Sequence, residues 1–88
     1  MKVHVKIYGA ELPQLLGRAL QVEVEIASTL QDLISKLERE IKEKHGWTLK
    51  ISSPNFYVLI NHRRVHKFKN LILKKGDVIT ILSPIGGG

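Results

Sequence analysis

The chain has 88 residues, enough for one domain and too few for a second hydrophobic core. It contains no cysteine, which excludes disulfide bonds, thiolate zinc sites and cysteine nucleophiles. The net charge of +6 is unevenly placed: residues 44–88 carry eight basic side chains and one acid, Asp77, whereas residues 1–43 carry six basic and seven acidic side chains. This asymmetry favours an acidic partner surface or a nucleic acid opposite the second half.

The first expected element is a half-buried strand, because Val3, Val5 and Ile7 alternate with polar side chains up to Tyr8. This alternation is unlike the apolar block of a signal peptide, and no apolar run approaches membrane-spanning length. We therefore expect a cytoplasmic protein without a membrane partner. A second alternating run completes an antiparallel hairpin and directs four side chains inward, namely Leu20, Val22, Val24 and Ile26.

A helix is expected after this hairpin. Ser28 or Thr29 suits the N-cap, with Gln31 or Asp32 placed to close a capping box, and Gly46 suits a left-handed C-cap. One apolar stripe follows helical spacing: Leu30, Leu33, Ile34, Leu37 and Ile41. Three i,i+4 pairs have the favourable polarity: Asp32–Lys36, Glu38–Lys42 and Glu40–Lys44.

The second half is expected to complete a sheet. Pro84 should end the last strand, because it has no amide hydrogen for the ladder. The expected elements are a connection at 47–55, a strand at 56–60, a turn at 61–64, a brief return at Val65, a turn at 75–77 and a final strand at 78–82.

The order of these elements predicts the fold class. One helix must cover one face of a mixed sheet of four to five strands, which is an α+β architecture. If the first and last strands are adjacent and parallel, the helix lies in a right-handed crossover between them, and the fold is the ubiquitin-like β-grasp. Residues 1–83 would form this domain, and residues 84–88 a flexible glycine-rich tail.

The tail predicts the working group of the chain. Three glycines after the last strand should stay mobile and fit a narrow channel on a partner. A free carboxylate is a poor acyl donor, but adenylation by ATP would give Gly88 a good leaving group. A sulfur nucleophile would then leave a thiocarboxylate, and a lysine amine would leave an isopeptide bond. The competing interpretation is a vector remnant or a plain disordered end.

Three segments carry a family resemblance: Val58-Leu59-Ile60-Asn61-His62-Arg63-Arg64-Val65, Leu73-Lys74-Lys75-Gly76-Asp77-Val78-Ile79 and Ser83-Pro84-Ile85-Gly86-Gly87-Gly88. They closely resemble the small, sulfur-carrying subunit of molybdopterin synthase. Val3–Tyr8, Leu15–Arg18 and Thr29–Leu33 look like the same family, so the resemblance spans nearly the whole chain. One departure is His62, where the family often has the glycine of an Asn-Gly turn; we expect a longer loop there, since histidine is strained at positive φ.

The resemblance implies a carrier that works through partners. An adenylyltransferase similar to ubiquitin-activating enzymes would use ATP on it, and the chain itself would bind no cofactor. Its Gly88 thiocarboxylate would enter a larger catalytic subunit and supply sulfur for the dithiolene of the molybdenum or tungsten cofactor. Pro84, Ile85, Gly86 and Gly87 would thread into that partner. The chain would not be an enzyme alone, and would form molybdopterin synthase only with the larger subunit.

The exposed sheet face is a candidate docking surface. If Phe56, Val58, Ile60, Ile79 and Ile81 face the helix, the alternate side chains lie on the uncovered face. The docking residues are then Tyr57, Leu59, Thr80 and Leu82, joined by Tyr8, Arg63 and Arg64. Scattered surface apolar residues, or cover from the 47–55 connection, are the plainer explanations.

A basic cluster surrounds Phe68 and consists of Arg63, Arg64, Lys67, Lys69, Lys74 and Lys75. We rank a solvated edge that discourages strand pairing first, an acidic groove on a protein partner second and RNA third. His62 and His66 lack an acidic companion, so no metal site is expected.

Three other functions stay open. The chain could be a modifier conjugated to lysines, a thiamine-pathway or tRNA-thiolation sulfur carrier, or an RNA-binding β-grasp module. The sequence contains no phosphate loop, paired catalytic carboxylates or supported Ser/His/Asp set.

Overall fold

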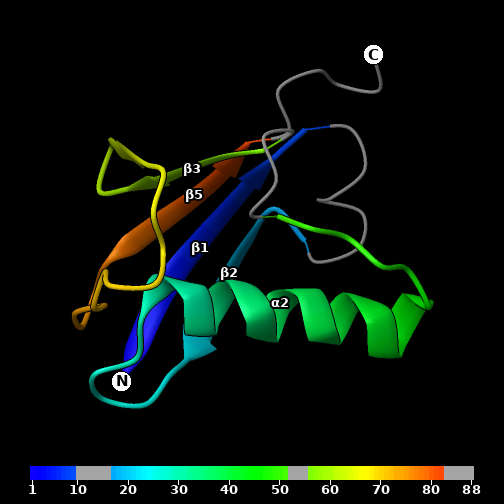
Figure 1. The fold of residues 1–88 in the computed structure, drawn as a ribbon, viewed down its shortest axis with the longest axis horizontal. Coiled ribbons are helices and arrows are strands. Elements are labelled where there is room, and N and C mark those ends of the chain that lie inside the picture. Colours follow the sequence, from blue (N-terminus) through cyan, green and yellow to red (C-terminus); the bar gives the residue numbers. More distant parts are fainter. Residues whose placement is uncertain (10–16, 52–55, 83–88) are drawn as a thin grey trace.

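The computed structural model describes residues 1–9, 17–51 and 56–82. Within them, five strands form one sheet with the order β2-β1-β5-β3-β4, and one helix packs across one face (Figure 1). The elements are β1 (Lys2–Tyr8), β2 (Ala19–Glu23), α2 (Leu30–His45), β3 (Tyr57–Ile60), β4 (Arg63–Val65) and β5 (Val78–Leu82). Strands β1 and β5 are parallel, and the other neighbours are antiparallel. This is the predicted β-grasp arrangement.

Helix α2 has both predicted caps. Thr29 Oγ1 accepts a hydrogen bond from the Asp32 amide at 3.2 Å, and an Asp32 carboxylate oxygen accepts one from the Thr29 amide at 2.9 Å. Gly46 ends the helix at φ 72°, where a side chain would be strained, and its amide donates to the Lys42 carbonyl. The predicted apolar stripe is buried along its whole length.

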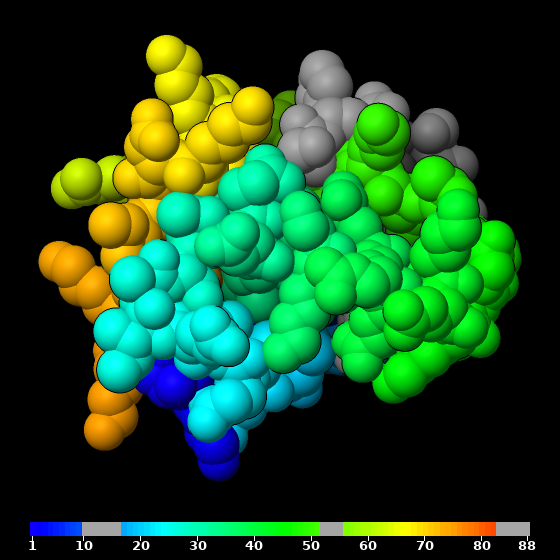
Figure 2. Space-filling model, turned by 60° about the horizontal axis from the view of Figure 1, so that its bottom comes forward, coloured from blue at the N-terminus to red at the C-terminus, as the bar shows by residue number. Residues whose placement is uncertain are grey.

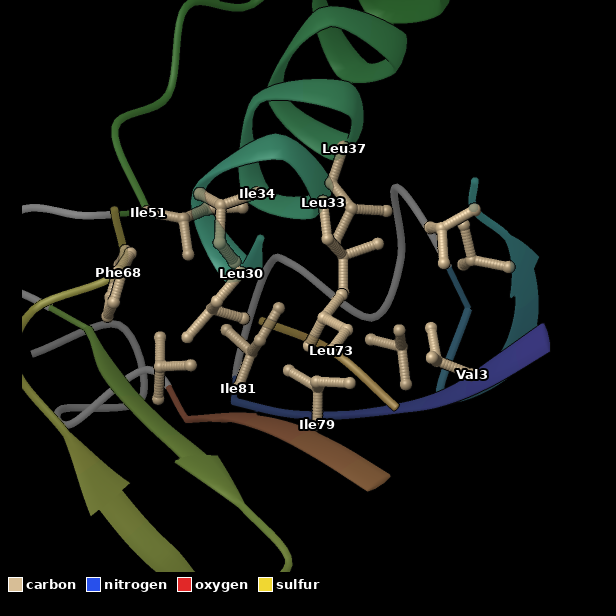
Figure 3. Close-up of a cluster of buried hydrophobic side chains, with 14 of the residues drawn as sticks. Val3, Leu30, Leu33, Ile34, Leu37, Ile51, Phe68, Leu73, Ile79 and Ile81 are labelled. Carbon is tan, nitrogen blue, oxygen red and sulfur yellow. The ribbon is translucent and has the colours of Figure 1, made fainter. Parts of the chain in front are cut away.

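The core lies between α2 and the sheet (Figure 3). Val3, Val5 and Ile7 of β1 and Ile79 and Ile81 of β5 are all at most 1% exposed. Their alternation with exposed or half-buried side chains follows from the two-residue period of a strand. The predicted core face of the sheet is therefore confirmed.

The connection after the helix adds a residue to this core. Ile51 is fully buried, and its amide donates a 2.6 Å hydrogen bond to a carboxylate oxygen of Glu38 on α2. Residues 47–51 thus run on the helix side, and no strand forms at 49–51.

Side chains of two predicted i,i+4 pairs of the helix have other partners. Glu38 accepts a hydrogen bond from the Ile51 amide, Asp32 accepts one from the Thr29 amide, and the Lys36 ammonium donates to the Glu23 carbonyl. Among the predicted i,i+4 pairs only Glu40–Lys44 forms within the described helix, at 3.1 Å.

The prediction that Ile26 points inward is wrong. Strand β2 ends at Glu23, and Val24 is the last buried side chain of the run. The Ser28 amide then donates to the Glu25 carbonyl, which closes a turn with Ala27 at φ 71°. Ile26 lies in this turn and is 86% exposed.

The expected longer loop after β3 is also wrong. Ile60 pairs directly with Arg63, so the turn contains only Asn61 and His62, at φ 48° and 74°. Two positive φ values define the I′ type of hairpin turn, which matches the twist of the strands. The Asn61 amide donates to the Val78 carbonyl and its side-chain oxygen accepts from the Val78 amide, and these bonds hold the strained turn against β5.

No helix in the described parts of the chain is long and apolar enough to cross a membrane.

Candidate functional site

The residues predicted to carry the chemistry, Pro84, Ile85, Gly86, Gly87 and Gly88, lie outside the described residues. The structure does place the strand that leads into them. Strand β5 is the middle strand of the sheet, with β1 on one side and β3 on the other. The position of Leu82, its last residue, is therefore fixed by ladders on both sides.

Leu82 lies between two tyrosines. It pairs with Tyr8 of β1 and with Tyr57 of β3, and residues directly opposite each other in a sheet share a face. The neighbouring Ile81 points into the core, so these three side chains lie on the face without the helix. Tyr8 is 53% and Tyr57 37% exposed, which leaves aromatic surface free beside the end of β5.

A second row crosses the same face two residues earlier. Thr80 pairs with Lys6 of β1 and with Leu59 of β3, and Leu59 pairs with Arg64 of β4. The Arg64 guanidinium carbon lies 4.1 Å from the centre of the Tyr57 ring, a cation–π distance that links the two rows. The structure thus gathers Tyr57, Leu59, Thr80, Leu82 and Arg64 on one surface, which we call the open face.

Arg63 is not part of the open face. It pairs with Ile60, which packs against the core, so its side chain leaves the sheet on the helix side. Consecutive side chains of a strand point to opposite faces, so Arg63 and Arg64 cannot share one face. The predicted docking surface included both arginines because this alternation was not applied to β4. Cover by the connection is also absent as far as that segment is described, because residues 47–51 run on the other side of the sheet.

The open face continues towards β2, where it is hollowed. The hollow has a volume of about 320 Å³, and the residues that line it include His4, Lys6, Gln21 and Val78. Sequence reasoning missed His4 as part of this surface, although its position between Val3 and Val5 already places it on the side of Lys6 and Tyr8. In the described part of the chain, no three His, Asp or Glu side chains come together as a metal-binding group.

A mixed five-stranded sheet that holds one helix, with the last strand in its centre, defines a ubiquitin-like β-grasp domain. The chain belongs to the ThiS family, whose sequence model matches residues 7–88. No curated protein sequence is similar enough to count as a match.

Solved structures share the fold over the whole chain. A putative molybdopterin converting factor subunit 1 from Pyrococcus furiosus is 24% identical with a TM-score of 0.75, covering 97% of this chain and 99% of that one. Small archaeal modifier protein 1 from Methanosarcina acetivorans is 25% identical with a TM-score of 0.68, covering 99% and 96%. A complex of subunits 1 and 2 of molybdopterin-converting factor from Helicobacter pylori contains a chain 24% identical, with a TM-score of 0.63 and full coverage of both.

Proposed function

We propose that the chain is a sulfur carrier whose reactive group is the C-terminal carboxylate of Gly88, and that it donates sulfur for molybdopterin, the organic part of the molybdenum or tungsten cofactor. The observation that carries this proposal is the family match, which runs through the terminal Gly-Gly-Gly, on a fold whose central strand leads into those residues. Sulfur carriers and ubiquitin-like modifiers share this fold.

The proposed chemistry has two steps. The carboxylate of Gly88 attacks the α-phosphate of ATP, which forms the acyl-adenylate and releases pyrophosphate. A hydrosulfide equivalent then attacks the carbonyl carbon, AMP leaves with the bonding electron pair, and a proton is released as the thiocarboxylate forms. No side chain of this protein takes part, so both steps need a partner that binds ATP and supplies the sulfur.

We propose two partners, an adenylyltransferase and a larger catalytic subunit. The Helicobacter pylori complex, in which a similar chain is subunit 1, supports the larger subunit. The open face is the proposed docking surface because it carries apolar and aromatic side chains, lies opposite the helix and flanks the end of β5. A partner seated on it would receive the tail as it leaves Leu82.

The test of the chemistry is pyrophosphate exchange with the cognate adenylyltransferase, followed by intact mass measurement. Full-length protein should exchange label and gain a species with one oxygen replaced by sulfur. A variant that lacks Gly88 should show neither, and should keep the thermal midpoint of the full-length chain because it retains every buried residue of the described core. Equal exchange by the shortened chain would refute the proposal.

Docking is tested separately by Leu59→Asp on the open face and Ile72→Asp as its control. Ile72 is 58% exposed and lies before the turn into β5, at the other end of that strand. The Leu59 variant should bind the larger subunit at least about tenfold more weakly, since a charge would be buried unpaired. The control should bind as the unchanged protein does; equal losses would argue against the open face.

A second candidate function is conjugation to lysines, favoured by the likeness to the archaeal modifier protein. Both functions begin with the adenylate and differ in the nucleophile that follows. Isopeptide adducts between Gly88 and target lysines in the native cell, without a thiocarboxylate species, would select the modifier over the sulfur carrier.

A further inference from the structure

Six cations lie on β4, at the edge of the sheet, and in the segment that follows it; Arg64 is on the open face, whereas Lys67 and Lys69 lie beside the start of the helix. We call this set the basic edge; it consists of Arg63, Arg64, Lys67, Lys69, Lys74 and Lys75, and all six are exposed. Figure 2 shows the side chains of the yellow and orange segment projecting along one border of the molecule, beside the helix. Five of them lie outside the open face, and Arg64 belongs to both sets.

Within the part of the chain that the structure describes, no carboxylate is paired with the basic edge. Asp77 is the acid nearest in sequence, and its two carboxylate oxygens accept from the Asn61 side-chain amide at 3.0 Å and from the Lys74 backbone amide at 2.8 Å. The ion pairs of the N-terminal ammonium with Glu23 and of Lys44 with Glu40, both between described residues, involve none of these six cations. The charge of the basic edge is therefore left for solvent or for a partner.

Protection of a sheet edge explains only part of this charge. Charged side chains on an outer strand prevent pairing with another chain, and Arg63 and Arg64 on β4 serve this purpose. The four lysines follow β4 in a segment without a long strand to protect. They call for a different explanation.

Two of these lysines border a second hollow. It has a volume of about 320 Å³, and its lining includes His66, Lys67, Lys69 and Asn70 around Phe68. The helix N-terminus beside it adds no free donor: the Leu30 and Gln31 amides donate to the carbonyls of Leu71 and Phe68. Any anion in the hollow would thus meet flexible lysine ammonium groups, which suits the variable positions of phosphates along a nucleic acid.

Arg64 adds a flat contact surface. Its guanidinium carbon lies 4.1 Å from the centre of the Tyr57 ring and its side chain is exposed, so its planar group can be reached by an unpaired base. Lysine is depleted at the centres of protein–protein interfaces, and four of the six cations are lysines. The planar Arg64 group and the excess of lysine over arginine both favour a nucleic acid over an acidic protein as the partner of the basic edge.

We propose that the basic edge binds single-stranded RNA, with the lysines contacting phosphates and the Arg64–Tyr57 stack contacting a base. RNA is chosen because it is the nucleic acid that commonly presents unpaired bases. The proposal does not depend on the tail or on its activation, so it can fail or succeed independently of the proposed function.

The test is fluorescence anisotropy with a labelled oligouridine of about 15 nucleotides, titrated at several salt concentrations. Lys67→Gln/Lys69→Gln should weaken binding roughly tenfold at low salt and reduce the salt slope by about 1.4, which corresponds to two phosphate contacts on a single strand. The matched control, Lys42→Gln/Lys50→Gln, removes the same charge near the C-terminal end of α2 and should change the slope little. Arg64→Lys should weaken binding a few-fold and keep the slope, because the charge stays and the plane is lost.

Four results would overturn the proposal. They are the absence of binding at low salt, equal effects of the two double variants, binding of polyglutamate or of duplex RNA as tight as that of the single strand, and tighter binding of single-stranded DNA than of RNA. Binding of polyglutamate would reassign the basic edge to an acidic protein partner. Circular dichroism of each variant, whose altered side chains are all exposed, should match that of the unchanged protein.

Discussion

Replacing Ile51 with alanine should destabilise the domain strongly, although this residue lies in a connection. Its side chain is fully buried in the core, beside Ile34 of α2 (Figure 3). The substitution removes three carbon groups at about 0.8 kcal/mol each, and the cavity left behind raises the expected loss to about 3–4 kcal/mol. A chain of this length is stable by only about 4–13 kcal/mol, so the variant loses a large share of its stability.

Chemical denaturation of Ile51→Ala and Ile72→Ala measures this effect against a matched control. Both residues are isoleucines outside the strands and the helix, but Ile72 is 58% exposed and should cost less than about 1 kcal/mol. In a thermal scan, the Ile51 variant should melt roughly 12 °C or more below the unchanged protein. Similar losses for both variants would show that the connection is not part of the core.

Three further predictions concern a turn, the helix N-cap and the hydrogen bonds of Asp77, and the same denaturation assay checks them. Ala27→Gly should stabilise the domain by about 0.5–1 kcal/mol, because alanine is strained at the φ of 71° found there. Ala19→Gly in β2 should destabilise it by a similar amount. A loss of stability in both variants would show that Ala27 is not strained. Thr29→Ala should cost about 1 kcal/mol through loss of the N-cap, and Ser28→Ala much less; equal costs would contradict the assignment of the cap. Asp77→Ala should cost about 1–3 kcal/mol because two hydrogen bonds before β5 are lost, and an unchanged midpoint would show that these bonds contribute nothing.

Local patterns were sufficient to predict most of the fold. The helix could be placed from Thr29 and Gly46, because capping depends on neighbouring residues only. The sheet faces followed from alternation, which is set by backbone geometry. The parallel pairing of β1 with β5 was expected because it places the helix in a right-handed crossover, where its apolar stripe covers one face of the sheet.

Two features that the sequence did not predict depend on contact between residues far apart in the chain. Ile51 is buried because Glu38 on the helix accepts its amide, and no local pattern records that bond. Asn61 and His62 keep a strained two-residue turn because Val78 and Asp77 bind the asparagine side chain. For the candidate site, alternation was enough to predict the open face, whereas the hollow beside Phe68 forms only where residues 66–70 meet the start of α2.

The parallel pairing of β1 and β5 has a mechanical consequence. Met1 lies at the start of β1, where its ammonium group donates to the Val24 carbonyl at 2.7 Å, and Leu82 lies at the far end of β5. A force that pulls Met1 and Leu82 apart loads the hydrogen bonds between β1 and β5 in shear, so that they carry the load together instead of opening one after another. The hydrogen bonds between β1 and β5 must then break together, and force spectroscopy with handles at the two ends should record a single high-force rupture.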